Sequence, residues 1–102
     1  MTDYDHAAID EVLHSRVRLA IVAFLAGAGS ADYSAIRTAI KTSEGNASVH
    51  LRKLEDSGYV LVEKRFVARK PQSLYRLTEA GRHALNAYVT HLESLLRPRR
   101  QK

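Results

Sequence analysis

The residues best suited to chemistry lie in the stretch TSEGNASVHLRKLEDSGYV, which runs from Thr42 to Val60. Small residues and an amide side chain stand at its beginning, and long cationic side chains follow one to two helical turns later. An amide can donate and accept hydrogen bonds at once, and cations bind phosphate groups. The stretch therefore predicts non-covalent recognition of a polyanion.

Groups for catalysis or metal binding do not occur in a useful arrangement. The chain has no cysteine, and it shows no paired acids, Ser–His arrangement or phosphate-binding loop. The spacing of His83 and His91 places them on different parts of a helix surface, and His91 and Glu93 do not face each other. We expect no catalytic residue, no metal site and no cofactor.

The charge of the chain also indicates a polyanionic partner. Sixteen Lys and Arg residues against eleven Asp and Glu give a net charge of +5. The excess is concentrated in residues 37–76 and in the final RPRRQK. Nucleic acid is a more natural partner for this distribution than an anionic membrane, although a generic solvated basic surface remains an alternative.

Length and composition are those of one globular domain. The chain has 102 residues, of which 45% are hydrophobic and 26% charged. No apolar run is long enough to span a membrane, and the acidic N-terminus is unlike a secretory signal, so we expect a cytoplasmic protein. We expect the domain to cover residues 1–96, followed by a disordered basic tail at 97–102.

Periodicity, capping residues and turn residues divide the chain into short elements. The expected caps are Ser15, Asp32, Thr42 or Ser43, and Thr78, and Pro71 is expected near the tip of a hairpin turn. The pattern predicts helices at about 6–13, 16–26, 33–41, 44–57 and 79–96, and strands at about 59–66 and 73–78. The fold class is therefore α+β, mostly helical, with a winged helix-turn-helix: four helices, a β-hairpin wing and a long C-terminal helix.

The predicted helix at 44–57 has two distinct faces on a helical wheel. One face gathers Ala47, His50, Leu51 and Leu54 and is expected to be buried. The other face suits entry into the DNA major groove, because small leading residues allow close approach and Asn46 and Val49 can contact adenine and thymine. An amphipathic surface helix with an incidental basic face is the alternative. The predicted contacts are Ser43, Gly45, Asn46, Ser48, Val49, Arg52 and Lys53.

The predicted hairpin is the most basic part of the domain. Its cations suit a wing, at about 65–73, that follows the DNA backbone or probes the minor groove. Alternatively, these charges only keep a strand edge from aggregating. The predicted DNA contacts here are Arg65, Arg69 and Lys70.

The run GNASVHLRKLEDSGYVLVEKRF, followed by PQSLYRLTEAGR, resembles winged-helix transcriptional regulators related to the MarR and ArsR groups. The resemblance covers roughly residues 9 to 96 and implies a dimer that binds an operator, commonly as a repressor, without enzymatic activity. The chain departs from ArsR-like metal sensors, since it lacks their cysteine pair. The matching positions are His14 to Arg16, Leu19, Asn46 to Ser48, His50, Leu51, Leu54, Gly58 to Val60, Lys64, Phe66, and Leu77 to Arg82.

The outer helices offer a means of self-association. The last helix carries an apolar stripe that runs beyond what a small core needs, and the first helix is placed to pack beside it. Alternatively, the stripe folds back on its own domain. The predicted dimer interface consists of Ile9, Val12, Leu13, Leu85, Tyr88, Val89, Leu92, Leu95 and Leu96.

Together these features predict a sequence-specific, dimeric DNA-binding transcriptional regulator, acting as a repressor on double-stranded DNA. The alternative is a winged-helix module that binds protein and has no operator. Such a module should show a contiguous apolar patch on the helix at 44–57, whereas the sequence places one valine there among polar and basic residues. A small-molecule effector is compatible with the sequence, but no residue indicates one.

Overall fold

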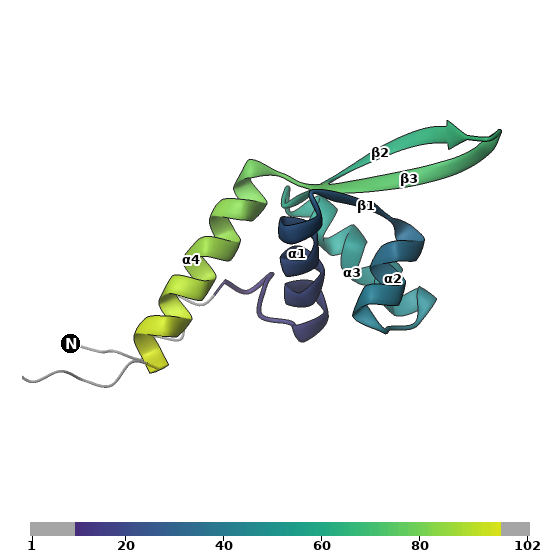
Figure 1. Cartoon of the computed structure of the whole chain (residues 1–102). Helices are drawn as coiled ribbons and strands as arrows, with labels where there is room; N and C mark the ends of the chain where they lie inside the picture. The colour runs from purple at the N-terminus through teal and green to yellow at the C-terminus, as the bar shows by residue number, and fades with distance from the viewer. Residues whose placement is uncertain (1–9, 97–102) are drawn as a thin grey trace, which may run out of the picture.

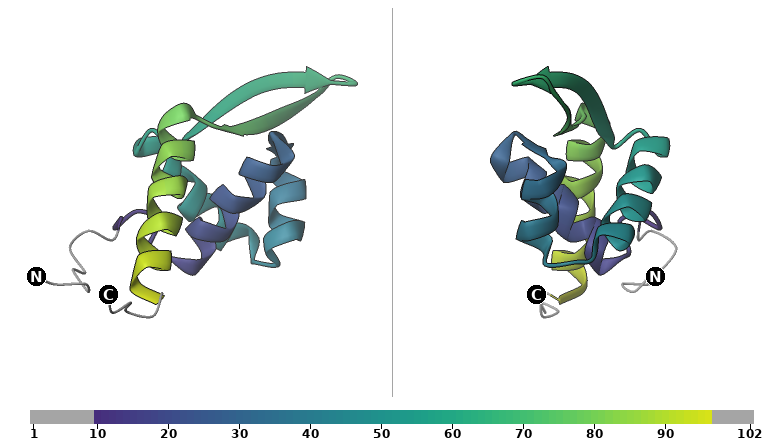
Figure 2. Two further views of the ribbon diagram at one scale, coloured as in Figure 1. Left: turned by 60° about the vertical axis from the view of Figure 1, so that its left-hand side comes forward. Right: turned by 90° about the vertical axis from the view of Figure 1, so that its right-hand side faces the viewer.

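The structure of the protein, a computed structural model, describes residues 10–96. Four helices and a three-stranded antiparallel sheet make up this described part of the chain, and the hairpin lies at one end of the helical body (Figures 1 and 2). The predicted fold class, a mostly helical α+β winged helix-turn-helix, is confirmed. The elements are α1 (Arg16–Ala28), β1 (Ser30–Asp32), α2 (Tyr33–Ile40), α3 (Glu44–Asp56), β2 (Val60–Val67), β3 (Lys70–Leu77) and α4 (Glu79–Leu96).

The segment before α1 differs from the predicted helix at 6–13. Residues 6–9 lie outside the described residues, and residues 11–13 form a turn. The Asp10 carboxylate accepts hydrogen bonds from the backbone N–H groups of Val12 (2.8 Å) and Leu13 (3.1 Å). A short Asp side chain competes with helical hydrogen bonding in this way, which explains why residues 11–13 form a turn.

The helices begin where the capping residues predict. The hydroxyl of Ser15 accepts from the N–H of Arg18, Asp32 caps α2 through Ala35, and Ser43 caps α3 through Asn46. Between α2 and α3, Lys41 takes a left-handed conformation with φ of 60°, which closes the tight turn. These caps set the start of α3, and therefore which of its side chains face outward.

The sheet contains one strand that the sequence pattern did not reveal. The short β1 pairs with β3, so the strand order is β1-β3-β2 and β2 forms an edge. The hairpin turn is also shorter than expected, because Pro71 lies within β3 opposite Phe66 and only Ala68 and Arg69 form the turn. Both turn residues have positive φ, 51° and 69°. Asn and Gly usually mark such turns, so the sequence carried no signal for it.

The start of α4 is fixed to the end of α3 by Thr78. Its hydroxyl donates to the carbonyl of Gly58 (2.7 Å) and accepts from the N–H of Gly81 (3.0 Å). Its own N–H donates to the carbonyl of Tyr59 (3.0 Å). The Leu-Thr-Glu-Ala-Gly run therefore joins the wing to α4 at a defined angle.

One core holds these elements together. It lies between α1, α2, α3 and the base of the sheet, and the first half of α4 packs against it. None of the helices in residues 10–96 has the length and apolar character that crossing a bilayer requires. The buried core residues are Leu13, Ile21, Val22, Leu25, Ala31, Ile36, Leu51, Leu54, Val60 and Leu77.

Candidate nucleic-acid interface

The inner face of α3 fixes the direction of its outer face. Ala47, Leu51 and Leu54 are buried, as the helical wheel predicted. At about 100° per residue, Val49 then lies near the middle of the opposite face, where it exposes 65% of its surface. Such exposure of an apolar side chain at the centre of a helix face is what a thymine methyl contact would require.

The first turn of α3 leaves room for close approach. A Cβ atom added to Gly45 would meet nothing within 4 Å, and Gly45 itself is exposed. The hydroxyl of Ser43 accepts from the N–H of Asn46 at 3.2 Å, so Ser43 serves as a cap as well as lying at the predicted interface. The positive end of the helix dipole adds attraction for phosphate at this turn.

Asn46 is exposed and oriented by a neighbour that the sequence analysis did not identify. Its amide nitrogen donates to the hydroxyl of Thr42 at 2.8 Å. An amide nitrogen has two hydrogens, so one hydrogen and the amide oxygen stay available for the edge of an adenine. The signal was present in the sequence, because Thr42 precedes Asn46 by four positions across the cap.

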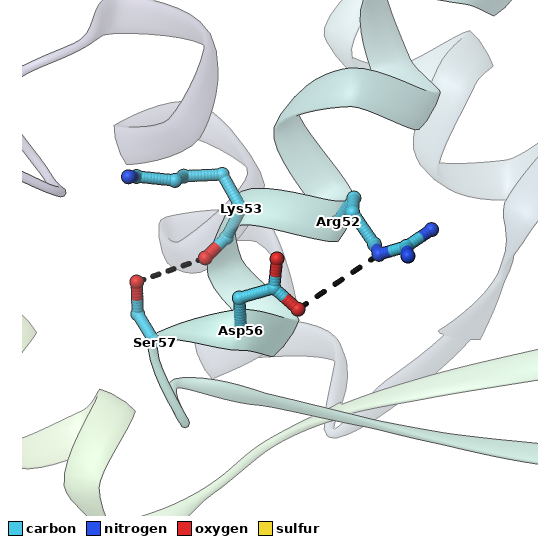
Figure 3. A network of polar contacts seen from close by, with 4 residues as sticks. All are labelled: Arg52, Lys53, Asp56 and Ser57. Carbon is cyan, nitrogen blue, oxygen red and sulfur yellow. Dashed lines mark hydrogen bonds and ion pairs between the residues drawn. The ribbon is translucent and has the colours of Figure 1, made fainter.

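Arg52 and Lys53 point to different sides of α3 (Figure 3). Arg52 forms an ion pair with Asp56, with 3.8 Å between Nε and Oδ1, and the two side chains are 77% and 68% exposed. An ion pair this exposed contributes little to stability and can exchange for a phosphate contact. Both cations are accessible, because Lys53 is exposed as well.

A hollow separates α3 from the wing. Ser48, Arg52 and Glu55 line its helical side, and Val62, Lys64 and Tyr75 line its sheet side. Burial, and next the negative charge of Glu55, raise the pKa of the Tyr75 phenol. Ser48 also lies 3.0 Å from the hydroxyl of Tyr33, so the exposed side of α3 is tied to the start of α2.

The wing presents its cations in two ways. Arg69 and Lys70 are exposed at the tip. Arg65 instead donates to Gln72 (3.1 Å), and Gln72 donates to the Asp32 carboxylate (3.1 Å). This chain of hydrogen bonds links the wing to the cap of α2 and holds the Arg65 side chain in place.

His50 connects α3 to α1 on the inner side. An Arg18 nitrogen lies 3.2 Å from His50 Nδ1, and Arg18 Nε donates to the carbonyl of Val12 at 2.6 Å. Burial, and next the positive charge of Arg18, lower the pKa of His50. Because Arg18 can only donate, Nδ1 must accept, so the neutral form of His50 fits this site.

The predicted dimer residues occupy three different environments. Leu13 is fully buried in the core of its own chain and has no surface to offer a partner, so its assignment to the interface needs correction. Val12, Leu85 and Tyr88 are half-buried against the core, whereas Ile9 lies outside the described residues. The remaining positions form the exposed or half-buried end of α4: Val89, Leu92, Leu95 and Leu96.

Within residues 10–96, no three His, Asp or Glu side chains come close enough to hold a metal ion. The exposed polar groups of α3 and the wing include amides, hydroxyls and cations, which form reversible contacts, and apolar Val49 and Phe66 are exposed beside them. Their chemistry is that of a surface that binds an anionic polymer.

Comparison with known proteins agrees with this geometry. Residues 17–96 match the family described as winged helix DNA-binding domain. The chain belongs to this family.

Individual members and solved structures extend the comparison. A protein of Methanocaldococcus jannaschii is 27% identical over 85 residues, which are 83% of this chain and 92% of the relative. A transcriptional regulator homologue from Pyrococcus horikoshii OT3 has a TM-score of 0.84 and 26% identity, covering 94% of this chain and 95% of that one. The transcriptional repressor BigR from Xylella fastidiosa has a TM-score of 0.65 and 27% identity, covering 97% and 100%. The predicted resemblance to winged-helix regulators is thus confirmed.

Proposed function

We propose that this winged-helix protein is a sequence-specific transcriptional regulator that binds double-stranded DNA as a homodimer and acts as a repressor. The observation that carries the proposal is the outer face of α3. It places an open Gly45, an oriented Asn46 amide and an exposed Val49 on one helical surface, with Arg52 one turn further along. Cations of the wing flank this surface.

Each part of the proposed interface has its own role. Asn46 and Val49 read base edges in the major groove, where an amide matches adenine and a methyl contact matches thymine. Ser43, Gly45 and Ser48 permit close approach of the first turns to the DNA. Lys53, Arg65, Arg69 and Lys70 bind phosphates and set overall affinity and its dependence on salt.

Dimerisation is proposed through the end of α4. Val89, Leu92 and Leu96 expose 44%, 37% and 77% of their surfaces, and Figure 1 shows this end of the helix leading away from α1. A two-fold dimer would bury the stripe and place two copies of α3 on successive turns of the DNA. The action as a repressor is supported by the 27% identity with BigR.

The proposal is tested by selecting bound duplexes from a random library and measuring fluorescence anisotropy with the selected duplex. We expect binding near physiological salt that survives a scrambled competitor and saturates at two chains per duplex. Equal binding to selected and scrambled duplexes, lost together as salt rises, would contradict sequence-specific regulation. The alternative function, a winged-helix module that binds another protein, would then be favoured.

A further inference from the structure

The wing carries an apolar side chain where a purely phosphate-binding hairpin needs none. Phe66 exposes 75% of its surface, and among the large hydrophobic residues described only Leu96 exposes more. Phe66 lies next to the turn, two residues before Ala68, and pairs with Pro71 on the neighbouring strand. Its ring and the proline ring therefore form a small apolar tip.

The register shows which way this tip faces. Side chains alternate along a strand, so Phe66 shares a face with Val62 and Lys64, and its partner Pro71 shares that face with Tyr75. The same face looks toward α2 and α3, because Val62, Lys64 and Tyr75 line the hollow beside α3. Pro71 in turn lines a second hollow together with Tyr33 and Ser48. The apolar tip and α3 thus face a common space.

The charges around the tip identify the occupant of that space. Lys64 shares the face of Phe66, Arg69 lies in the adjacent turn, and Arg65 and Lys70 point to the opposite face of the wing. All four cations are exposed. An apolar group at the tip of a strongly basic hairpin fits a partner with anionic rims and an apolar interior. The DNA minor groove has this chemistry, with phosphates along its edges and sugars and base edges inside.

We propose that Phe66, backed by Pro71, acts as a wedge that enters the minor groove beside the site of α3 and selects a deformable base step. The inference rests on the proposed DNA-binding function and extends it. Apolar side chains inserted from the minor groove partly unstack a step, and pyrimidine–purine steps such as TA resist this least. Phe66 therefore contributes sequence preference without a hydrogen bond to any base.

The test compares Phe66→Ala with Val67→Ala in the full chain. Val67 is the adjacent residue, is also apolar and exposed (47%), and points to the opposite face of the wing. Hydroxyl-radical footprinting of the selected duplex first locates the base step under the wing. Competition binding then uses duplexes with TA or AA at that step, and energy transfer between labelled duplex ends reports bending.

Wild type and Val67→Ala are expected to prefer TA by about tenfold, whereas Phe66→Ala should bind both duplexes within about twofold and bend them less. Equal TA preference in all three proteins would overturn the wedge while leaving the proposed function intact. The wedge is also overturned if Phe66→Ala leaves DNA binding and bending unchanged and alters only the oligomeric state seen in sedimentation. The tip would then be a contact between protein chains. Absence of any selective duplex binding by wild type would overturn both proposals.

Discussion

At the scale of single residues, the first turn of α3 is the most informative place in the chain. Gly45 is a poor helix former, yet nothing in the fold fills the space where its Cβ would be. Packing therefore gives no reason for a glycine here. Close approach of another molecule would explain the glycine, and the oriented amide of Asn46 lies next to Gly45.

Gly45→Ala should accordingly separate folding from binding. We expect the free energy of unfolding to stay equal or rise by up to about 1 kcal/mol, because alanine is the better helix former. Affinity for the selected duplex should fall by about tenfold, since the added methyl group lies against the DNA. Urea unfolding and anisotropy measure the two effects.

Gly27→Ala is the matched control, because a Cβ at Gly27 in α1 would also meet nothing within 4 Å. It should affect stability in the same direction and leave DNA affinity unchanged. If Gly45→Ala bound the selected duplex as tightly as Gly27→Ala, α3 would not approach DNA through its first turn.

His50 gives the fold a pH dependence with a definite sign. Its pKa lies below the ordinary value of 6.5, so the folded chain holds this proton less tightly than the unfolded chain does. The free energy of unfolding should therefore fall as pH drops below about 6.5, and this contribution should level off below the pKa of the folded state.

His50→Gln tests this contribution, because a glutamine oxygen can still accept from Arg18 while the titration is removed. We expect the stability difference, wild type minus variant, to decrease from about pH 8 to pH 5 in chemical unfolding. Other histidines are common to both proteins and cancel. A difference that is constant over this range would show that the proton on His50 is not linked to folding.

At the scale of elements, much of the fold follows from local sequence. Ser15 and Asp32 cap helices as predicted, Ser43 rather than Thr42 caps α3, and α4 has the expected bounds. The sequence pattern did not predict the elements whose structure depends on contacts between residues far apart in the chain. β1 has three residues and exists because β3 lies beside it, and the wing turn uses Ala68 and Arg69 without a glycine.

The candidate site shows the same division between local and tertiary information. The outward face of α3 could be predicted, because helix periodicity fixes it once Ala47, Leu51 and Leu54 are buried. The hydrogen bonds from Arg65 to Gln72 and from Gln72 to Asp32 could not be predicted, since they join residues that meet only in the folded sheet. Leu13 was assigned to the dimer interface but lies in the core, because a short apolar segment does not show which part of the fold covers it.

The junction between the wing and α4 yields a prediction about stability. A Cβ at Gly81 would overlap the carbonyl oxygen of Tyr59 and lie 2.7 Å from a methyl group of Leu77. Gly81→Ala should therefore lower the free energy of unfolding by about 1–3 kcal/mol, since α4 must shift to relieve the overlap. Thermal and urea unfolding measure it, again with Gly27→Ala as the unstrained comparison. An unchanged midpoint would mean that α4 is not docked through this turn.

At the scale of the whole molecule, α4 divides into a half that packs against the core and a half whose apolar side chains are exposed. Leu85 and Tyr88 pack against the core, whereas Val89, Leu92 and Leu96 remain exposed. The molecule is elongated, with principal extents of 63 × 25 × 21 Å. A dimer formed through the end of α4 would place two wings and two α3 helices on one DNA duplex.

Leu92→Asp should disrupt that dimer, because a carboxylate in an apolar interface lacks a partner. We expect the variant to sediment as a monomer at micromolar concentration and to bind the selected duplex at least about tenfold more weakly. Thr90→Asp adds the same charge at an exposed position away from the stripe and should remain dimeric. A wild-type protein that is itself monomeric in solution and on DNA would refute the dimer.

The measurement that tests the central claim most directly compares Asn46→Ala and Arg69→Ala with wild type on the selected and scrambled duplexes across a salt series. The account predicts that Asn46→Ala loses about 1–3 kcal/mol of preference for the selected duplex, with little change on the scrambled one. Arg69→Ala should weaken binding to both duplexes alike and reduce the salt slope by about one. An Asn46→Ala variant with the site preference and affinity of wild type would contradict recognition by α3.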